Sequence, residues 1–224
     1  MRSLLILFIS LILYTNNVIG QIAMIQDKDG YTNVRSKPQS DSDVIYKLYE
    51  DEIFWFGEEY YDESKTWVPV YITFNKFSIG SMMHNYFKGY IHKSRLNPLE
   101  ENLTKDSNVN LEYEIVPFNT EKRFIRSNEN GVVYQIDGLN FFGTDGELPK
   151  TEVKSVKVEI DGKRIVIPEI LYQDLYNCNN RINIFKKEDL CFFENTNSDG
   201  AGGYQIIWVF KSGKLIQRLV GSIY

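Results

Sequence analysis

The chain has 224 residues, 43% hydrophobic and 25% charged, with 25 Lys and Arg against 30 Asp and Glu and a formal net charge of −5. That apolar mass is enough for one large or two small cores and excludes a disordered chain. The acidic balance excludes a sequence-wide basic surface, so we expect no nucleic-acid partner. Histidine is also scarce, with only His84 and His92. Because most nucleophile–base pairs and transition-metal sites use histidine, the composition favours binding over catalysis, without a cofactor or metal.

Residues 1–20 have the pattern of a secretory signal. Arg2 precedes an apolar run from Leu4 to Tyr14, which is too short to span a bilayer as a helix. Small residues before Gln21 then predict cleavage at that position, and a short membrane anchor is the alternative. We therefore expect a secreted or periplasmic protein that is not inserted in a membrane once the signal is removed.

The next part of the chain alternates short β-branched and aromatic runs with turn residues. Five strands are predicted in it, at Tyr31–Arg35, Val44–Tyr49, Ile53–Phe56, Thr66–Ile72 and Lys88–His92. Tight turns and almost no helical periodicity predict a small β-barrel.

One run in this part resembles a known family. The residues Gly30–Pro38 read Gly-Tyr-Thr-Asn-Val-Arg-Ser-Lys-Pro, which resembles the G-x-x-N-V-R-x-x-P signature of bacterial SH3-like (SH3b) domains. Trp67–Val70 and Gly89–Ile91 are similar to that family's tryptophan strand and closing strand, and Leu96 matches its terminal apolar residue. The resemblance covers residues 24–97 and implies an SH3-like barrel. One departure is the long insert Thr73–Phe87, which could cover a ligand groove or build a new one.

The resemblance also implies a ligand. SH3-like grooves stack extended peptides on aromatic side chains, and in the bacterial family the ligand is often a cell-wall peptide. We expect the ligand-binding residues among the exposed polar and aromatic positions of the barrel, namely Tyr31, Asn33, Arg35, Tyr60, Tyr61 and Tyr90.

An acidic cluster lies beside these tyrosines. It contains Glu58, Glu59, Asp62 and Glu63, and Trp67 follows it. Carboxylates next to aromatic rings are typical of a carbohydrate site, whereas a run of charges is more often a solvated loop. The solvated loop is the favoured interpretation.

A polar run at residues 98–110 is predicted to be a linker, and residues 111–224 to be a second, β-rich domain of unknown function. Two hairpins are expected in that domain. Val153–Ile160 pairs with Lys163–Ile167 across Asp-Gly, and Tyr204–Phe210 pairs with Lys214–Val220 across a turn that contains Ser-Gly. Between the hairpins, Pro168–Tyr176 has apolar residues at helical spacing, which predicts one short helix. The predicted fold class is therefore mainly β, with an SH3-like small barrel and a β-rich domain with one short helix.

The two cysteines and one oxygen-rich loop are the remaining candidates for a chemical site. In an oxidising compartment Cys178 and Cys191 are expected to form a disulfide, with two unpaired buried thiols as the alternative. Neither cysteine has a base beside it, and a Cys178–His84 pair matches no arrangement that the spacing supports. The loop Asn195–Gly203 has oxygen donors but only one carboxylate, so a turn is favoured over a calcium site.

The sequence therefore predicts an exported, non-enzymatic protein that binds cell-wall peptide or an envelope protein, with no catalytic residues. Two alternatives stay open, and the oligomeric state is not predicted. One alternative is an envelope hydrolase that uses carboxylates of the second domain, such as Glu169 with Asp174 or Glu194. The other is an inhibitor or immunity-type protein, which a large exposed apolar patch would favour.

Overall fold

The structure is a computed structural model that describes residues 21–80, 86–102, 104–106 and 108–222. The predicted signal, residues 1–20, lies outside the described residues, as do His84 and the other residues of 81–85. The described part is mainly β and contains short 3₁₀ turns but no α-helix. None of its helices is long and apolar enough to cross a membrane.

The N-terminal region forms one antiparallel sheet of seven strands in the order β3-β2-β6-β5-β4-β1-β7. The strands are β1 (Ile22–Ile25), β2 (Tyr31–Arg35), β3 (Val44–Tyr49), β4 (Phe54–Phe56), β5 (Trp67–Thr73), β6 (Tyr86–His92) and β7 (Leu96–Pro98), with the 3₁₀ turns η1 (Glu58–Tyr60) and η2 (Lys93–Arg95). The five predicted strands are present, and β1 and β7 are added to them. In the described residues, the ladder is not closed, because β3 and β7 are its two edges.

The sheet bends around a single core. Alternate residues of every strand point into this core, among them Ile25, Val34, Leu48, Val70 and Ile91, all fully buried. The residues between them point away from this core, because side chains alternate along a strand. This alternation decides which residues of the N-terminal sheet can meet a ligand.

The C-terminal region contains three further antiparallel sheets. A four-stranded sheet, in the order β13-β14-β15-β16, consists of β13 (Asn183–Lys187), β14 (Leu190–Asn197), β15 (Tyr204–Lys211) and β16 (Lys214–Ser222). A three-stranded sheet consists of β12 (Lys163–Val166), β11 (Thr151–Ile160) and β8 (Val109–Pro117), and a small two-stranded one of β9 (Ile125–Ser127) and β10 (Val133–Ile136). The remaining 3₁₀ turns are η3 (Leu99–Asn102), η4 (Glu169–Leu171) and η5 (Gly200–Gly202).

Both predicted hairpins are confirmed. Strands β11 and β12 pair across Asp161-Gly162, and both turn residues have positive φ, at 50° and 75°. Strands β15 and β16 turn at Ser212-Gly213 with φ of 49° and 74°. Two successive positive φ angles match the right-handed twist of the flanking strands, which is why Gly follows Asp or Ser there.

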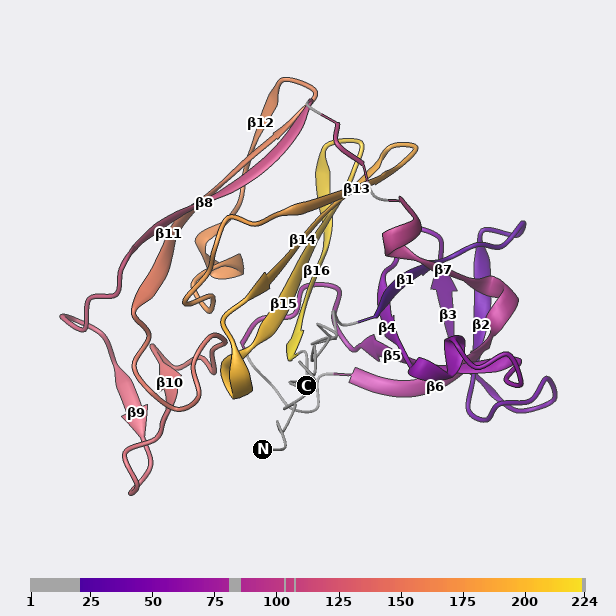
Figure 1. Ribbon diagram of the computed structural model, residues 1–224, viewed down its shortest axis with the longest axis horizontal. Helices are drawn as coiled ribbons and strands as arrows, with labels where there is room; N and C mark the ends of the chain where they lie inside the picture. Colours follow the sequence, from indigo (N-terminus) through magenta and orange to yellow (C-terminus); the bar gives the residue numbers. More distant parts are fainter. Residues whose placement is uncertain (1–20, 81–85, 103, 107, 223–224) are drawn as a thin grey trace, which may run out of the picture.

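The four-stranded sheet is the middle layer of the molecule. One of its faces packs on the three-stranded sheet through residues such as Trp208 and Phe210. Its other face packs on the N-terminal sheet, where Ile207, Val209 and Leu219 share a core with Met24 and Ile53. Figure 1 shows this order, with the four-stranded sheet between the three-stranded sheet and the N-terminal sheet.

The segment predicted as a linker, residues 98–110, is packed against β13. Leu99 is buried in the core shared by the two regions, the Thr104 amide donates to the Ile184 carbonyl, and Asp106 pairs with Lys186 at 2.7 Å. A direct contact also joins the regions, because the Gln217 side chain bonds both the amide and the carbonyl of Ile53, each at 2.9 Å. The two regions therefore share one hydrophobic and hydrogen-bonded interface.

The helix predicted at Pro168–Tyr176 is wrong. Only η4 forms, and the backbone leaves helical geometry at Tyr172, where φ is −138°. Leu175 and Tyr176 form isolated bridges with Phe142 and Glu152, respectively. A nine-residue helix is marginal by itself, so these tertiary bridges and burial of the apolar side chains prevail over helical spacing.

The disulfide predicted between Cys178 and Cys191 is not formed, and both cysteines are buried free thiols. Cys178 Sγ lies 2.9 Å from the Tyr204 hydroxyl, at one end of β15, while Cys191 pairs with Phe210 near the other end. Six residues of strand separate those two positions by about 20 Å. A disulfide needs Cα atoms about 4.4–6.8 Å apart, so the sheet keeps these cysteines from pairing.

Candidate functional site

The outer face of the N-terminal sheet collects aromatic and cationic side chains. In an antiparallel ladder, opposed residues point to the same side. Arg35 of β2 is opposite Tyr90 of β6, and Lys88 of β6 is opposite Tyr71 of β5. Because Val34, Ile91 and Val70 point inward, these side chains all face out. Tyr31, Asn33, Arg35 and Tyr90, which the sequence analysis named, therefore share one face.

Lysine side chains lie over the tyrosine rings of this face. Lys88 Nζ lies 5.5 Å from the ring centre of Tyr90 and 5.8 Å from that of Tyr71, while Lys47 Nζ lies 4.3 Å from that of Tyr31. These distances are typical of cation–π contacts. Partial desolvation acts to lower the pKa of the Lys88 ammonium, but the adjacent Tyr71, Tyr90 and Glu59 outweigh it, so its pKa is raised. Lys88 is therefore an exposed positive charge beside both rings.

Arg35 has a structural role on this face, whereas Asn33 is only partly accessible. The Arg35 guanidinium donates to the Ser42 carbonyl at 2.6 Å and so holds the loop between β2 and β3. Asn33 is half-buried, and its Oδ1 has no hydrogen-bond partner among the described residues. Tyr31 and Tyr90 are half-buried, with their rings against lysines, and they are the predicted residues that this face offers most directly to a ligand.

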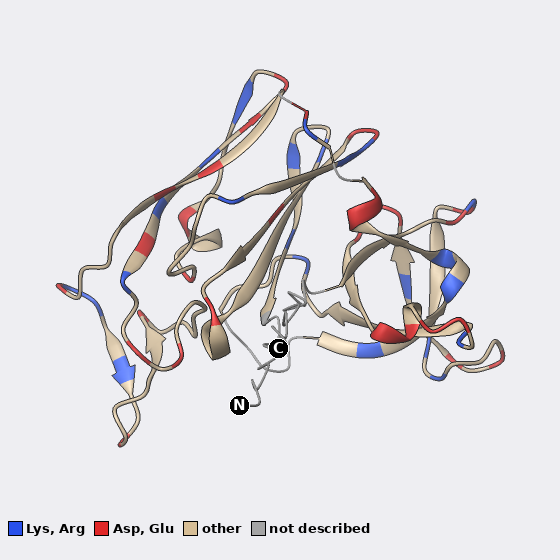
Figure 2. Cartoon of the chain, in the orientation of Figure 1, with Lys and Arg blue, Asp and Glu red and all other residues tan. Residues whose placement is uncertain are grey.

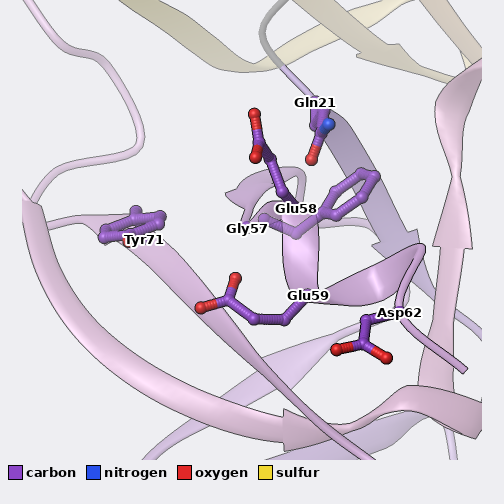
Figure 3. Close-up of a pocket in the computed structure, with 7 residues that line it drawn as sticks. Gln21, Gly57, Glu58, Glu59, Asp62 and Tyr71 are labelled. Carbon is purple, nitrogen blue, oxygen red and sulfur yellow. The ribbon is translucent and has the colours of Figure 1, made fainter. Parts of the chain in front are cut away.

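An open pocket of about 570 Å³ adjoins this face at the turn after β4. Its lining residues are Gln21, Phe56, Gly57, Glu58, Glu59, Asp62 and Tyr71. Figure 3 shows Glu59 extended toward Tyr71, with Glu58 and Gln21 on one rim and Asp62 on the other side. The pocket therefore combines an aromatic wall with carboxylates from η1 and the loop after it.

The carboxylates that line the pocket form no ion pair within the described residues. Glu58, Glu59 and Asp62 are exposed, and no ion pair of the described residues includes them. Hydrogen bonds from the hydroxyl and the amide of Ser64 lower the pKa of the Asp62 carboxyl. No group of three His, Cys, Asp or Glu side chains within the described part could hold a metal ion. Glu58, Glu59 and Asp62 therefore give the pocket three exposed carboxylates.

Tyr60 and Tyr61, both in the predicted set, lie on the turn that carries these acids. Tyr60 packs against the core and stacks edge-on with Phe56, at 5.2 Å between ring centres. Tyr61 is exposed, and its hydroxyl donates to Glu100 at 3.4 Å. Burial, followed by the charges of Glu100 and Glu101, raises the pKa of both phenols. Tyr60 therefore supports the turn, and Tyr61 is the more exposed of the two.

Sequence reasoning missed Tyr71, Lys88 and Gln21 as site residues. A usable signal was present for Tyr71, because Trp67, Pro69 and Tyr71 alternate with the buried Val68, Val70 and Ile72 along β5. Lys88 stands two residues before Tyr90 and so faces the same side. Gln21 gave no signal, since its place beside Glu58 depends on how β1 pairs with β4.

The carboxylates named for a hydrolase do not form an open pair. Asp174 is fully buried, where its carboxylate pairs with the Arg218 guanidinium at 2.5 Å and accepts a hydrogen bond from the Gly80 amide at 2.6 Å. Glu194 is also buried, and it accepts hydrogen bonds from Asn183, Thr196 and Gln205. Glu169 is exposed on η4. The two buried carboxylates are therefore occupied by structural contacts.

Charged residues of both signs are mixed along the described chain. Figure 2 shows Lys and Arg interspersed with Asp and Glu along the strands and loops of both regions.

Comparison with protein-family models, curated proteins and solved structures found no match to this chain.

Proposed function

We propose that the chain is an exported, non-enzymatic binding protein whose N-terminal region is an SH3-like module that engages cell-wall peptide or an envelope protein. Support for the module comes from the signature at Gly30–Pro38 and from strands bent around a single core. The predicted export signal supports the compartment. We assign no catalytic residue and no cofactor.

The observation that carries this proposal is the position of Lys88 between Tyr71 and Tyr90, next to the acidic pocket. The rings offer flat surfaces to a ligand, Lys88 offers a cation to a ligand carboxylate, and Glu58, Glu59 and Asp62 offer anions to a ligand amine. A short peptide with a free amino group and a free carboxylate complements both charges. An extended ligand would lie across β2, β6 and β5 with its amine at the pocket.

A second candidate, a protein that blocks another protein, has an observation of its own. Several large apolar side chains are exposed on or beside the β9–β10 hairpin, namely Phe124, Val132, Tyr134 and Leu148. This hairpin projects from the rest of the C-terminal region in Figure 1. Exposed apolar side chains on a projecting element are typical of protein interaction sites.

The proposal is tested by co-sedimentation of residues 21–224 with purified cell-wall sacculi. The variants are Tyr71→Ala and Glu59→Gln at the candidate site, with Tyr134→Ala on the hairpin as the matched tyrosine control. We expect the two site variants to remain in the supernatant and the control to sediment like the wild type. Equal sedimentation of all variants would reject the site, and loss only with Tyr134→Ala would favour the second candidate.

A further inference from the structure

The predicted insert leaves the N-terminal sheet after β5, and its described part runs beside β16 (Figure 1). Phe77 forms a parallel bridge with Arg218. The Arg218 amide donates to the Lys76 carbonyl at 2.8 Å, and the Ser78 amide donates to the Arg218 carbonyl at 3.2 Å. Residues 76–78 thus act as a short fifth strand on an edge that the other strands of the four-stranded sheet leave open.

Buried side chains of the C-terminal region stabilise this contact. The Arg218 guanidinium donates to the Ser78 carbonyl and to Asp174, at 2.5 Å from the carboxylate, and Asp174 also accepts from the Gly80 amide at 2.6 Å. The side chains of Arg218 and Asp174 are fully buried. Separation of the insert from β16 would take the Ser78 carbonyl and the Gly80 amide away from these two buried charges, which costs far more than loss of a surface ion pair.

Ser78 and Phe77 add contacts from the insert itself. The Ser78 hydroxyl donates to the Arg218 carbonyl at 2.9 Å and accepts from the Val220 amide at 3.2 Å. Phe77 packs against the core of the C-terminal region, as does Ile79. Because the buried ion pair does not depend on either of these side chains, each can be changed without leaving a charge unpaired.

The insert is directly continuous with the candidate site. Thr73 and Tyr86, both within the insert, form the last pair of the β5–β6 ladder, and Tyr71 with Lys88 form the next pair on the same face. The Tyr86 ring also packs edge-on against Tyr71, at 5.7 Å between ring centres. The end of the ladder that carries the site is therefore the end that the insert holds.

A second tie lies on the other side of the insert. Lys76 pairs with Glu52 at 3.3 Å, and Glu52 is buried while it accepts a hydrogen bond from the Tyr46 hydroxyl at 2.9 Å. The insert is thus held by β16 on one side and by the N-terminal sheet on the other.

We infer that residues 76–78 of the insert, docked on β16 at Arg218, are a positioning segment for the candidate site and hold Tyr71 and Lys88 in register for the ligand. This inference rests on the proposed function, because it names a segment that supports peptide binding without contact to the peptide. It gives the C-terminal region a role in binding: the region sets the geometry of a site that lies on the N-terminal sheet.

The experiment compares four variants of residues 21–224. Phe77→Ala and Ser78→Ala loosen the insert, Asp174→Asn breaks the ion pair, and Val156→Ala is the matched control, since Val156 is buried in the same core but on β11. Affinity is measured for soluble peptides released from sacculi. Hydrogen exchange is followed at the backbone amides of the β5–β6 ladder, with the β2–β3 ladder as internal reference.

We expect the insert variants to bind peptide at least about 5-fold more weakly, within the range of ordinary coupling between sites. We also expect their exchange to rise at the β5–β6 ladder near Thr73 and Tyr86 but not in the β2–β3 ladder. The Val156→Ala control should change neither. If Asp174→Asn fails to fold, the two insert variants decide the matter.

The inference is overturned if the wild type binds peptide and the insert variants bind it within about 2-fold of wild type, a difference too small for coupling between sites. Equal weakening by Val156→Ala would overturn it as well, because a general loss of stability would then explain the effect. A wild type that binds no peptide identifies a different failure, that of the proposed function, and removes the basis for a positioning role.

Discussion

The buried ion pair between Arg218 and Asp174 gives the sharpest stability prediction. In the Asp174→Asn variant, the amide oxygen can still accept from Gly80, but the Arg218 guanidinium remains buried without a counter-charge. Breaking a buried pair in this way costs about 3–5 kcal/mol. Small proteins have total stabilities of about 5–15 kcal/mol, so the variant would lose a large share of its stability.

The assay is urea unfolding of the wild type, Asp174→Asn and the double variant Asp174→Asn with Arg218→Met. The double variant removes the orphaned charge, so it should be more stable than Asp174→Asn alone, although it contains one more substitution. If Asp174→Asn lowers the free energy of unfolding by less than about 1 kcal/mol, which is the value for exposed pairs, the predicted cost of the unpaired Arg218 charge is wrong. A double variant that is less stable than Asp174→Asn alone would contradict it as well.

Three further predictions concern the rest of the molecule. Gly143 has a φ of 109°, and a β-carbon there would collide with the Tyr176 carbonyl, so Gly143→Ala should lower the melting temperature far more than Gly131→Ala, whose site has open space. Burial raises the pKa of the Cys178 thiol to about 12, so iodoacetamide at pH 8 should leave it unmodified until urea unfolds the chain, and rapid labelling of the native protein would contradict this. Burial, followed by Glu52, raises the pKa of Tyr46 to about 12, so its contribution to stability is complete below pH 10 and is lost as the pH rises from 10 to 12; an absorbance titration that gives Tyr46 a pKa near 10 would contradict this.

Local sequence patterns were enough to predict most of the strands. Tyr31–Arg35 and Val44–Tyr49 match β2 and β3 in both bounds, because alternation and flanking turns are local signals. The turns at Asp161-Gly162 and Ser212-Gly213 were equally readable, since each requires positive φ at two positions. These features depend on residues close together in the chain.

Features that depend on distant contacts were not predictable from the same patterns. Pro168–Tyr176 has helical spacing, yet its last two residues form β-bridges with distant parts of the backbone. Asp174, in the same segment, pairs with Arg218, which is 44 positions away. Cys178 and Cys191 are close in sequence, but β13 and the turn after it lie between them. Cys178 therefore contacts Tyr204 at one end of β15, and Cys191 pairs with Phe210 near the other end. In both cases tertiary pairing outweighs local preference.

The candidate site was predictable in part. Tyr31 and Tyr90 do share an outer face, which follows from alternation on their strands. Arg35 is instead occupied by the Ser42 carbonyl, a contact that no local pattern shows. The acidic cluster was predicted as a solvated loop, and Glu58 and Glu59 are exposed, but their meeting with Tyr71 and Gln21 depends on the pairing of β1, β4 and β5.

Binding of cell-wall peptide to the N-terminal sheet can be measured directly by a nuclear magnetic resonance titration of residues 21–224 with soluble peptides released from cell walls. We expect backbone signals to shift along β5 and β6 around Tyr71, Lys88 and Tyr90, and at the turn that carries Glu58 and Glu59. Shifts confined to the β9–β10 hairpin, or no shifts at saturating peptide, would contradict a peptide site on the N-terminal sheet.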